Sequence, residues 1–86
     1  MGKSRRPHAQ HDPYYIRLRE RLRAIRNEAG LTQAQLGRVF EKPHTFIHKI
    51  EKGDRRIDPI EFSRWCKACG TDPGTTLTAI IRGMKK

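Results

Sequence analysis

The 86-residue sequence lacks any long hydrophobic run, since no stretch approaches the ~20 apolar residues that a membrane-spanning helix needs. The opening stretch, MGKSRRPHAQHDP, has no apolar segment of the kind found in secretory signals. We therefore expect a cytoplasmic protein that makes no contact with membranes.

Acidic residues are scarce as well. The chain has 9 Asp and Glu against 19 Lys and Arg, a formal net charge of +10, and its pI is about 10.5. This excess favours a polyanionic partner, most often nucleic acid, although a basic surface can also serve solubility alone. Aliphatic residues recur along the chain despite a mean hydropathy of −0.84, and the length suits one small domain.

No catalytic set of nucleophile, base and acid can be assembled from the sequence. Ser4 and Ser63 cannot be combined with a base and an acid into a catalytic set, and the chain has no glycine-rich phosphate loop. Cys66 and Cys69 form a C-x-x-C motif, but a redox motif belongs beside a βαβ unit and a structural zinc needs a second ligand pair. We predict a non-enzymatic protein whose cysteines pack in the core.

His44 and His48 lie four residues apart and therefore share one face of a helix. Both could ligate zinc, yet a metalloprotease helix would carry Glu where Thr45 stands, and no third ligand is apparent. We predict no metal and no cofactor.

Alternating strand patterns are absent, whereas helix start and stop signals recur. An apolar stripe from Leu18 to Ala29 predicts a helix over 14–29, with five arginines on its remaining surface. Capping boxes headed by Thr32 and Asp58 begin two further helices. Another helix is predicted over 43–52, and a last one follows Asp72–Pro73.

The apolar sides of these helices are predicted to build the core of an all-α, five-helix orthogonal bundle. Beyond the first helix they comprise Leu36, Val39, Phe40, Phe46, Ile47, Ile50, Phe62, Trp65, Cys66 and Cys69. Leu77, Ile80 and Ile81 are either core or a dimer surface. Gly37 interrupts the second helix at up to ~1 kcal/mol relative to Ala, which predicts close approach of another helix.

The helix over 43–52 presents a polar, basic face that suits the DNA major groove, which admits one α-helix. His44 and Thr45 lie in its first turn, where base edges are reached, and Lys49 and Lys52 are placed for phosphates. Thr32 and Gln33 begin the preceding helix, where backbone N–H groups favour a phosphate. We expect a basic arm or solvated tail over 1–13, the DNA-binding domain over 14–82 with its helix-turn-helix at 32–52, and a basic tail over 83–86.

The stretch LTQAQLGRVFEKPHTFIHKIEKGDRR resembles the helix-turn-helix of the Cro/CI-type (XRE) family of bacterial and phage regulators. Eight residues match the family pattern without a gap, namely Leu31, Thr32, Gln33, Leu36, Ile47, Ile50, Glu51 and Gly53. The sequence departs from the pattern at Glu41, where the family usually has a turn glycine, and at Pro43, where a Ser or Thr cap is common.

The resemblance implies a lambda-repressor-like fold and a homodimeric repressor that binds a palindromic operator on double-stranded DNA. It implies that Gln33 contacts a phosphate, and that base edges or adjacent phosphates are contacted by His44, Thr45, His48 and Lys49. It also implies backbone contacts beyond the helix from Lys52, Arg55 and Arg56.

Two alternatives stay open. The same fold serves as the antitoxin of toxin–antitoxin pairs, where a small protein is the partner and DNA binding is autoregulatory. A general nucleic-acid binder is the other, although the chain lacks the aromatic platforms of single-strand readers. The histidines add a testable expectation, which is tighter and less selective DNA binding as pH falls through ~6.5, the usual histidine pKa.

Overall fold

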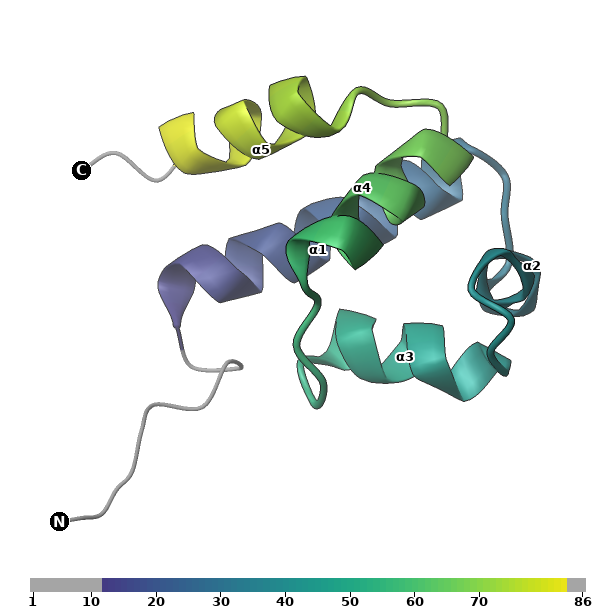
Figure 1. Cartoon of the computed structure of the whole chain (residues 1–86). Helices are drawn as coiled ribbons and strands as arrows, with labels where there is room; N and C mark the ends of the chain where they lie inside the picture. The colour runs from purple at the N-terminus through teal and green to yellow at the C-terminus, as the bar shows by residue number, and fades with distance from the viewer. Residues whose placement is uncertain (1–11, 84–86) are drawn as a thin grey trace, which may run out of the picture.

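The computed structural model describes residues 12–83, and within this range it contains helices and no strand. Five helices follow one another along the chain (Figure 1). They are α1 (Pro13–Glu28), α2 (Gln33–Val39), α3 (His44–Lys52), α4 (Pro59–Ala68) and α5 (Pro73–Arg82). The predicted all-α class and the five-helix bundle are confirmed. Among the described residues, no helix combines the length and apolarity needed to cross a membrane.

The predicted arm and tail lie almost entirely outside the described residues. The exceptions at the start are Asp12 and Pro13, which belong to the first helix and not to an arm. The Asp12 carboxylate caps α1 by accepting the N–H of Tyr14 at 2.9 Å, and Pro13 follows as the first helical residue. Proline is favoured there because its missing N–H would have no helical partner anyway.

The capping boxes predicted from the sequence are present. The Thr32 Oγ1 accepts the Gln35 N–H at 3.0 Å, and the Gln35 side chain returns an acceptor to the Thr32 N–H at 2.8 Å. Asp58 and Glu61 form the same reciprocal pair at the start of α4. These local bonds satisfy backbone N–H groups that a helix leaves without partners at its start.

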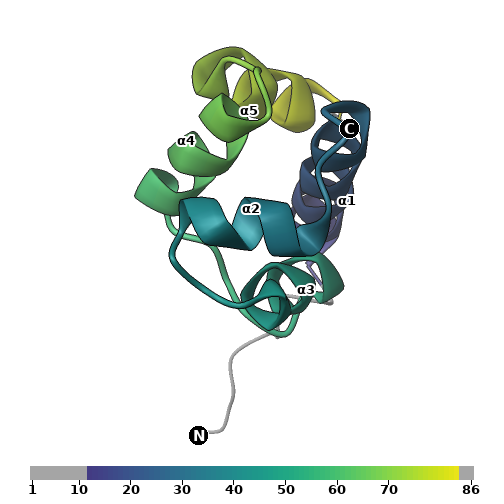
Figure 2. The same ribbon diagram turned by 90° about the vertical axis from the view of Figure 1, so that its right-hand side faces the viewer.

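The helices form a bundle in which α3 and α5 lie on opposite sides. In Figure 1, α3 is at the lower edge and α5 at the upper edge, with α1 and α4 between them. Figure 2 shows the same order from a second direction. There α3 is seen nearly end-on, and α2 lies across it and packs on it. This arrangement leaves one side of α3 to solvent.

All five helices contribute to one hydrophobic core. Its members are Leu22, Ile25, Leu36, Phe40, Ile47, Ile50, Phe62, Trp65, Cys66 and Ile80. The indole Nε1–H of Trp65 donates to the carbonyl of Leu22 at 3.1 Å. Such a bond satisfies the only polar atom that the buried Trp65 side chain brings into the core.

Helix periodicity predicted the burial of several residues wrongly, most of them near helix ends. Ala29 is the exposed C-cap of α1, Val39 ends α2 with 43% of its surface exposed, and Cys69 caps α4 half-buried. In α5 only Ile80 is core, whereas Leu77 and Ile81 are exposed. Near these helix ends fewer neighbouring helices cover the apolar stripe, so its residues are exposed or, like Cys69, only packed against the edge of the core.

The turn between α2 and α3 explains why residue 37 is a glycine and shows the backbone conformation of Glu41. A Cβ at Gly37 would lie 2.7 Å from the Lys42 carbonyl oxygen, so the close neighbour is the turn backbone and not the predicted second helix. Glu41 adopts a left-handed conformation with φ 57°, at the position where the family usually has glycine. Pro43 then serves as the extended N-cap of α3 and not as its first residue.

Candidate nucleic-acid interface

The polar side of α3 is open to solvent. Ile47 and Ile50 are fully buried against the core. The exposed residues, which we call the α3 surface, are His44, Thr45, His48, Lys49 and Lys52. Polar hydrogen-bonding groups and two permanent positive charges thus share one side of a single helix, which is the arrangement that reaches base edges and phosphates in a DNA groove.

A buried ion pair fixes α3 to α1. The Glu51 carboxylate accepts from the Arg26 Nε at 2.6 Å and from the Arg26 Nη2 at 3.1 Å, and both side chains are less than a tenth exposed. Arg26 was predicted to lie on the surface, which is wrong, because only 8% of the residue is exposed. Arg26 also donates through Nη1 to the carbonyl of Leu31 at 2.8 Å. The same side chain therefore holds both the α1–α2 connection and Glu51 of α3.

Gln33 joins this network. Its Nε2 donates to the Glu51 Oε1 at 3.0 Å, which links the start of α2 to the last turn of α3. The amide oxygen and the second N–H of Gln33 remain available, and the side chain is only half-buried. Glu51 was recognised from the sequence only as a matched position. The signal that would have revealed its role is an acidic residue next to the buried Ile50 on the inward side of α3.

Thr32 keeps a donor for an outside partner. Its Oγ1 accepts the Gln35 N–H, which leaves the hydroxyl hydrogen free to point outward from an exposed side chain. Thr32 and Gln33 thus stand next to each other where α2 begins.

The two arginines in the loop after α3, Arg55 and Arg56, have different partners. The Arg55 guanidinium binds both oxygens of Glu61, at 2.9 and 3.0 Å, and lies 4.6 Å from the centre of the Phe46 ring. The hydrogen bond to Glu61 raises the pKa of Arg55, and the same bond lowers the pKa of Glu61. Within residues 12–83 no carboxylate pairs with the exposed Arg56, which lies 5.6 Å from the Tyr15 ring.

Tyr15 holds this loop in place, a role that the sequence analysis missed. Its hydroxyl oxygen accepts the Ile57 N–H at 2.9 Å, and its O–H donates to the Arg55 carbonyl at 3.4 Å. Burial raises the pKa of the Tyr15 hydroxyl. Because the two partners are about 40 residues from Tyr15, no local pattern reveals the contact.

A small cavity of ≈ 220 Å³ lies beside α3, and we call it the α1–α3 pocket. Its lining comes from three helices and comprises Arg23, Gln33, His48, Glu51 and Lys52. Arg23 was not among the predicted site residues. Its position in sequence marks only the exposed face of α1, and tertiary packing brings that face beside α3.

The candidate metal and thiol groups do not come together in the described part of the chain. Among residues 12–83, no three His, Cys, Asp or Glu side chains are grouped as metal ligands would be. Cys66 is fully buried, and burial raises the pKa of the Cys69 thiol to about 11. A thiol with such a pKa is almost wholly protonated at neutral pH and therefore a poor nucleophile and ligand.

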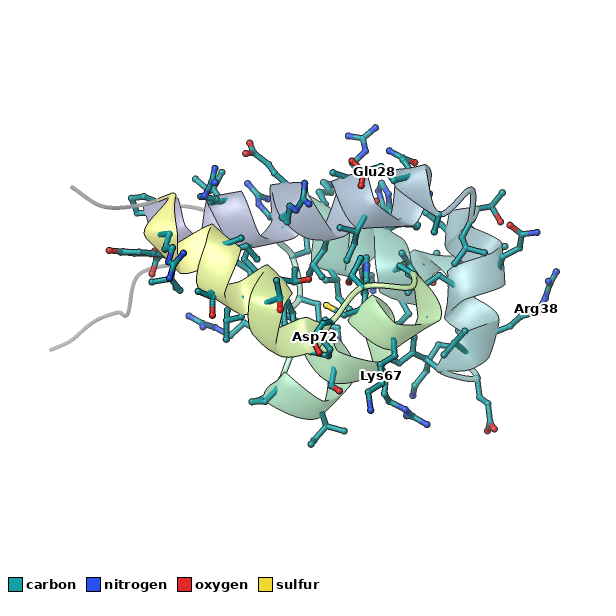
Figure 3. All side chains as sticks on the ribbon, turned by 90° about the horizontal axis from the view of Figure 1, so that it is seen from above. Glu28, Arg38, Lys67 and Asp72 are labelled. Carbon is teal, nitrogen blue, oxygen red and sulfur yellow. The ribbon has the colours of Figure 1, made fainter. Side chains whose placement is uncertain are left out.

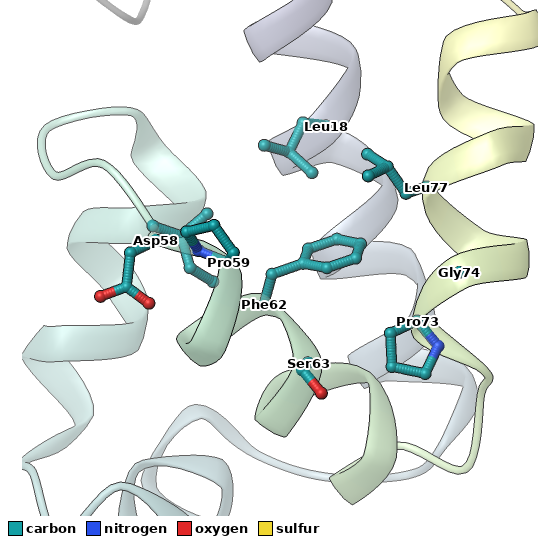
Figure 4. Close-up of a pocket in the computed structure, with 9 residues that line it drawn as sticks. Leu18, Asp58, Pro59, Phe62, Ser63, Pro73, Gly74 and Leu77 are labelled. Carbon is teal, nitrogen blue, oxygen red and sulfur yellow. The ribbon is translucent and has the colours of Figure 1, made fainter.

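The far side of the bundle has a different surface. An apolar groove of ≈ 330 Å³ lies between α1, α4 and α5, with Leu18, Phe62 and Leu77 facing one another across it (Figure 4). Leu77 is 45% exposed at its rim, and Ile81 is 51% exposed one turn further along α5. We call Leu77, Ile81 and this groove the α5 surface. Elsewhere charged side chains such as Glu28, Arg38 and Lys67 point away from the bundle (Figure 3).

Comparisons with known proteins agree with this geometry. The family described as helix-turn-helix domain matches residues 17–79. A solved structure, described as an XRE-family like protein from Pseudomonas syringae pv. tomato str. DC3000, is 35% identical to the chain. The match covers 87% of this chain and 92% of that one, with a TM-score of 0.80. No curated protein matches the chain.

The family match reaches from within α1 into α5 and includes all of α2, α3 and α4, and the fold is typical of non-enzymatic regulators. The chain therefore belongs to the helix-turn-helix domain family, among the XRE-type DNA-binding transcriptional regulators.

Proposed function

We propose that the protein is a sequence-specific repressor that places α3 in the major groove of a palindromic operator. The observation that carries the proposal is the α3 surface, on which five polar or basic side chains are exposed together while Ile47 and Ile50 anchor the helix from behind. In this mode His44 and Thr45, in the first helical turn, contact base edges. Lys49 and Lys52 contact phosphates or bases further along the groove.

The flanking residues supply contacts to the DNA backbone. Thr32 and Gln33 have polar groups available at the start of α2, and Arg56 has a charge that no described carboxylate offsets. Arg55 contributes less than the sequence suggested, because Glu61 already neutralises its guanidinium. Where an operator overlaps a promoter, occupying it represses transcription, since a bound protein excludes other proteins from the same stretch of DNA.

A homodimer would read such a palindrome, and the α5 surface is the candidate contact. Leu77 and Ile81 expose apolar area beside a groove whose lining is almost entirely apolar. None of the residues of the α3 surface lines that groove, so a contact there leaves α3 free for DNA. The same surface also suits a small protein partner, as in the antitoxin alternative.

Selection of bound duplexes from a random pool tests the proposal. A palindrome with half-sites about 34–36 Å apart, one helical turn, is the expected result. Competition with bulk DNA at about 150–200 mM salt should leave the selected complex intact, because binding by charge alone weakens steeply there. Enrichment of no sequence would exclude operator recognition, and a selected site that represses no reporter gene would exclude a repressor.

A further inference from the structure

We propose that the α1–α3 pocket receives one phosphate of the DNA backbone, with Arg23 of α1 as a direct ligand. This inference rests on DNA being the partner, and it adds an α1 residue to an interface otherwise built from α2, α3 and the following loop. It also assigns His48 to a phosphate, where the sequence left base edges and phosphates as alternatives.

The pocket has the chemistry of a phosphate site. Arg23 and Lys52 bring positive charge from two helices, and His48 brings a hydrogen-bonding ring from the middle of α3. The one acidic member is Glu51, whose charge is already offset by Arg26 in a bond of 2.6 Å. Lys52 lies 3.6 Å from the exposed Asp54 carboxylate, a contact that solvent screens, so the net positive charge of the pocket comes chiefly from Arg23.

The geometry also favours a phosphate over a larger group. A volume of ≈ 220 Å³ accommodates a phosphodiester with its adjoining atoms, and every residue that lines the pocket ends in a polar or charged group. Gln33 is held at the pocket by its bond to Glu51, with a second amide N–H still to donate. Arg23, His48 and Lys52 are all exposed, so a duplex lying along α3 can reach them.

Arg23→Gln compared with Arg21→Gln tests the assignment. Both residues are exposed on α1 and remote from the core, but only Arg23 lines the pocket. We expect Arg23→Gln to weaken binding about three- to tenfold on a selected duplex and on a random-sequence duplex alike. It should also reduce the salt slope by about 0.9, so that between 50 and 200 mM salt the wild type loses about three- to fourfold more affinity than the variant.

Single methylphosphonate linkages then locate the phosphate. Each removes one backbone charge, and one linkage should weaken the wild-type complex distinctly more than it weakens Arg23→Gln, in which the other pocket residues remain. Equal affinities and salt slopes for the two arginine variants would overturn the inference. If the wild type selects no sequence, the proposed repressor fails, yet the comparison on the random duplex at 50 mM salt still decides the pocket.

Substitutions compared at one pH assign His48. We expect His48→Gln to weaken binding to the selected duplex and to the random-sequence duplex alike, because its ring lines the pocket. His44→Gln should weaken mainly the selected duplex, because His44 contacts base edges in the proposed mode. A loss for His48→Gln that is confined to the selected duplex would overturn the assignment of His48.

Discussion

The α3 surface and the α5 surface lie on opposite sides of one small bundle and are built in opposite ways. The α3 surface is polar and basic, and a network of charged and amide groups from α1 and α2 fixes the helix beneath it. The α5 surface is apolar, and its helix is tied to α1 by the bond from the Arg17 Nε to the Ile80 carbonyl at 3.1 Å.

The difference shows how a short chain separates two tasks. A polar surface remains hydrated until a charged partner binds, so it contributes nothing to holding its own helix. Contacts on the buried side of α3 must therefore position that helix. An exposed apolar surface gains stability only when a partner covers it. The two surfaces should therefore respond differently to mutation, and the following predictions are ordered from the largest expected effect to the smallest.

Breaking the buried ion pair between Glu51 and Arg26 should lower the free energy of unfolding more than any other change considered. Glu51→Ala leaves Arg26 charged and buried without its partner, which typically costs about 3–5 kcal/mol. Glu61→Gln is the matched control, because it removes the charge from a partly exposed arginine pair while keeping an acceptor for the α4 capping box, and it should cost no more than about 1 kcal/mol. Urea unfolding measures both. Equal losses would mean that the buried pair has no special part in holding α3.

A charge on the α5 surface should disrupt the proposed dimer. Leu77→Glu places a carboxylate in an apolar contact and should weaken self-association by about 2 kcal/mol or more, roughly 30-fold. Ile60→Glu serves as control, since Ile60 is 70% exposed but does not line the groove. Sedimentation equilibrium reports the dissociation constants. A dimer that tolerates Leu77→Glu must form through another surface.

Substitutions on the α3 surface should separate base reading from phosphate binding. Thr45→Ala should cost about 1–3 kcal/mol at particular base pairs, whereas Lys52→Ala should weaken all sequences alike. Titrations with the selected operator and single-base variants measure this. If both substitutions weaken every sequence equally, Thr45 does not read bases.

The turn between α2 and α3 should gain stability from the residue that the family usually has there. Glu41→Gly removes the strain of a side chain in the left-handed region and should stabilise the fold by about 0.5–1 kcal/mol. Glu20→Gly, in the interior of α1, should instead destabilise by a similar amount. Thermal unfolding distinguishes the signs, and a destabilised Glu41→Gly would contradict the strain.

The smallest expected effect is the loss of folding stability at low pH that comes from Glu61. Because the bond to Arg55 lowers the folded-state pKa of Glu61 below the ordinary 4.5, its contribution is complete above that pH and is lost as pH falls through the folded-state value. Glu61→Gln should therefore be less stable than the wild type at pH 6, and the gap should shrink below pH 4.5. A constant gap in urea unfolding at pH 6 and pH 3 would exclude this linkage.

Most of the fold was predictable because its signals are local. Thr32 with Gln35 and Asp58 with Glu61 announce helix starts within four residues, and the capping bonds themselves span that distance. The family resemblance likewise depended on one continuous stretch. The errors fell at helix ends such as Ala29 and Val39, where burial depends on whether another helix extends that far.

Local signals along the chain were enough to predict five helices, the capping boxes at Thr32 and Asp58, an excess of positive charge and a segment whose polar side suits DNA. The packing of the helices was needed to show that Arg26 turns inward to Glu51, that Tyr15 secures the loop at Ile57, and that Arg23 stands beside His48. The cause is the distance along the chain between the residues in contact. Caps and periodicity involve neighbours along one helix, whereas these contacts join residues 25 or more positions apart, and only the packing of whole helices brings them together.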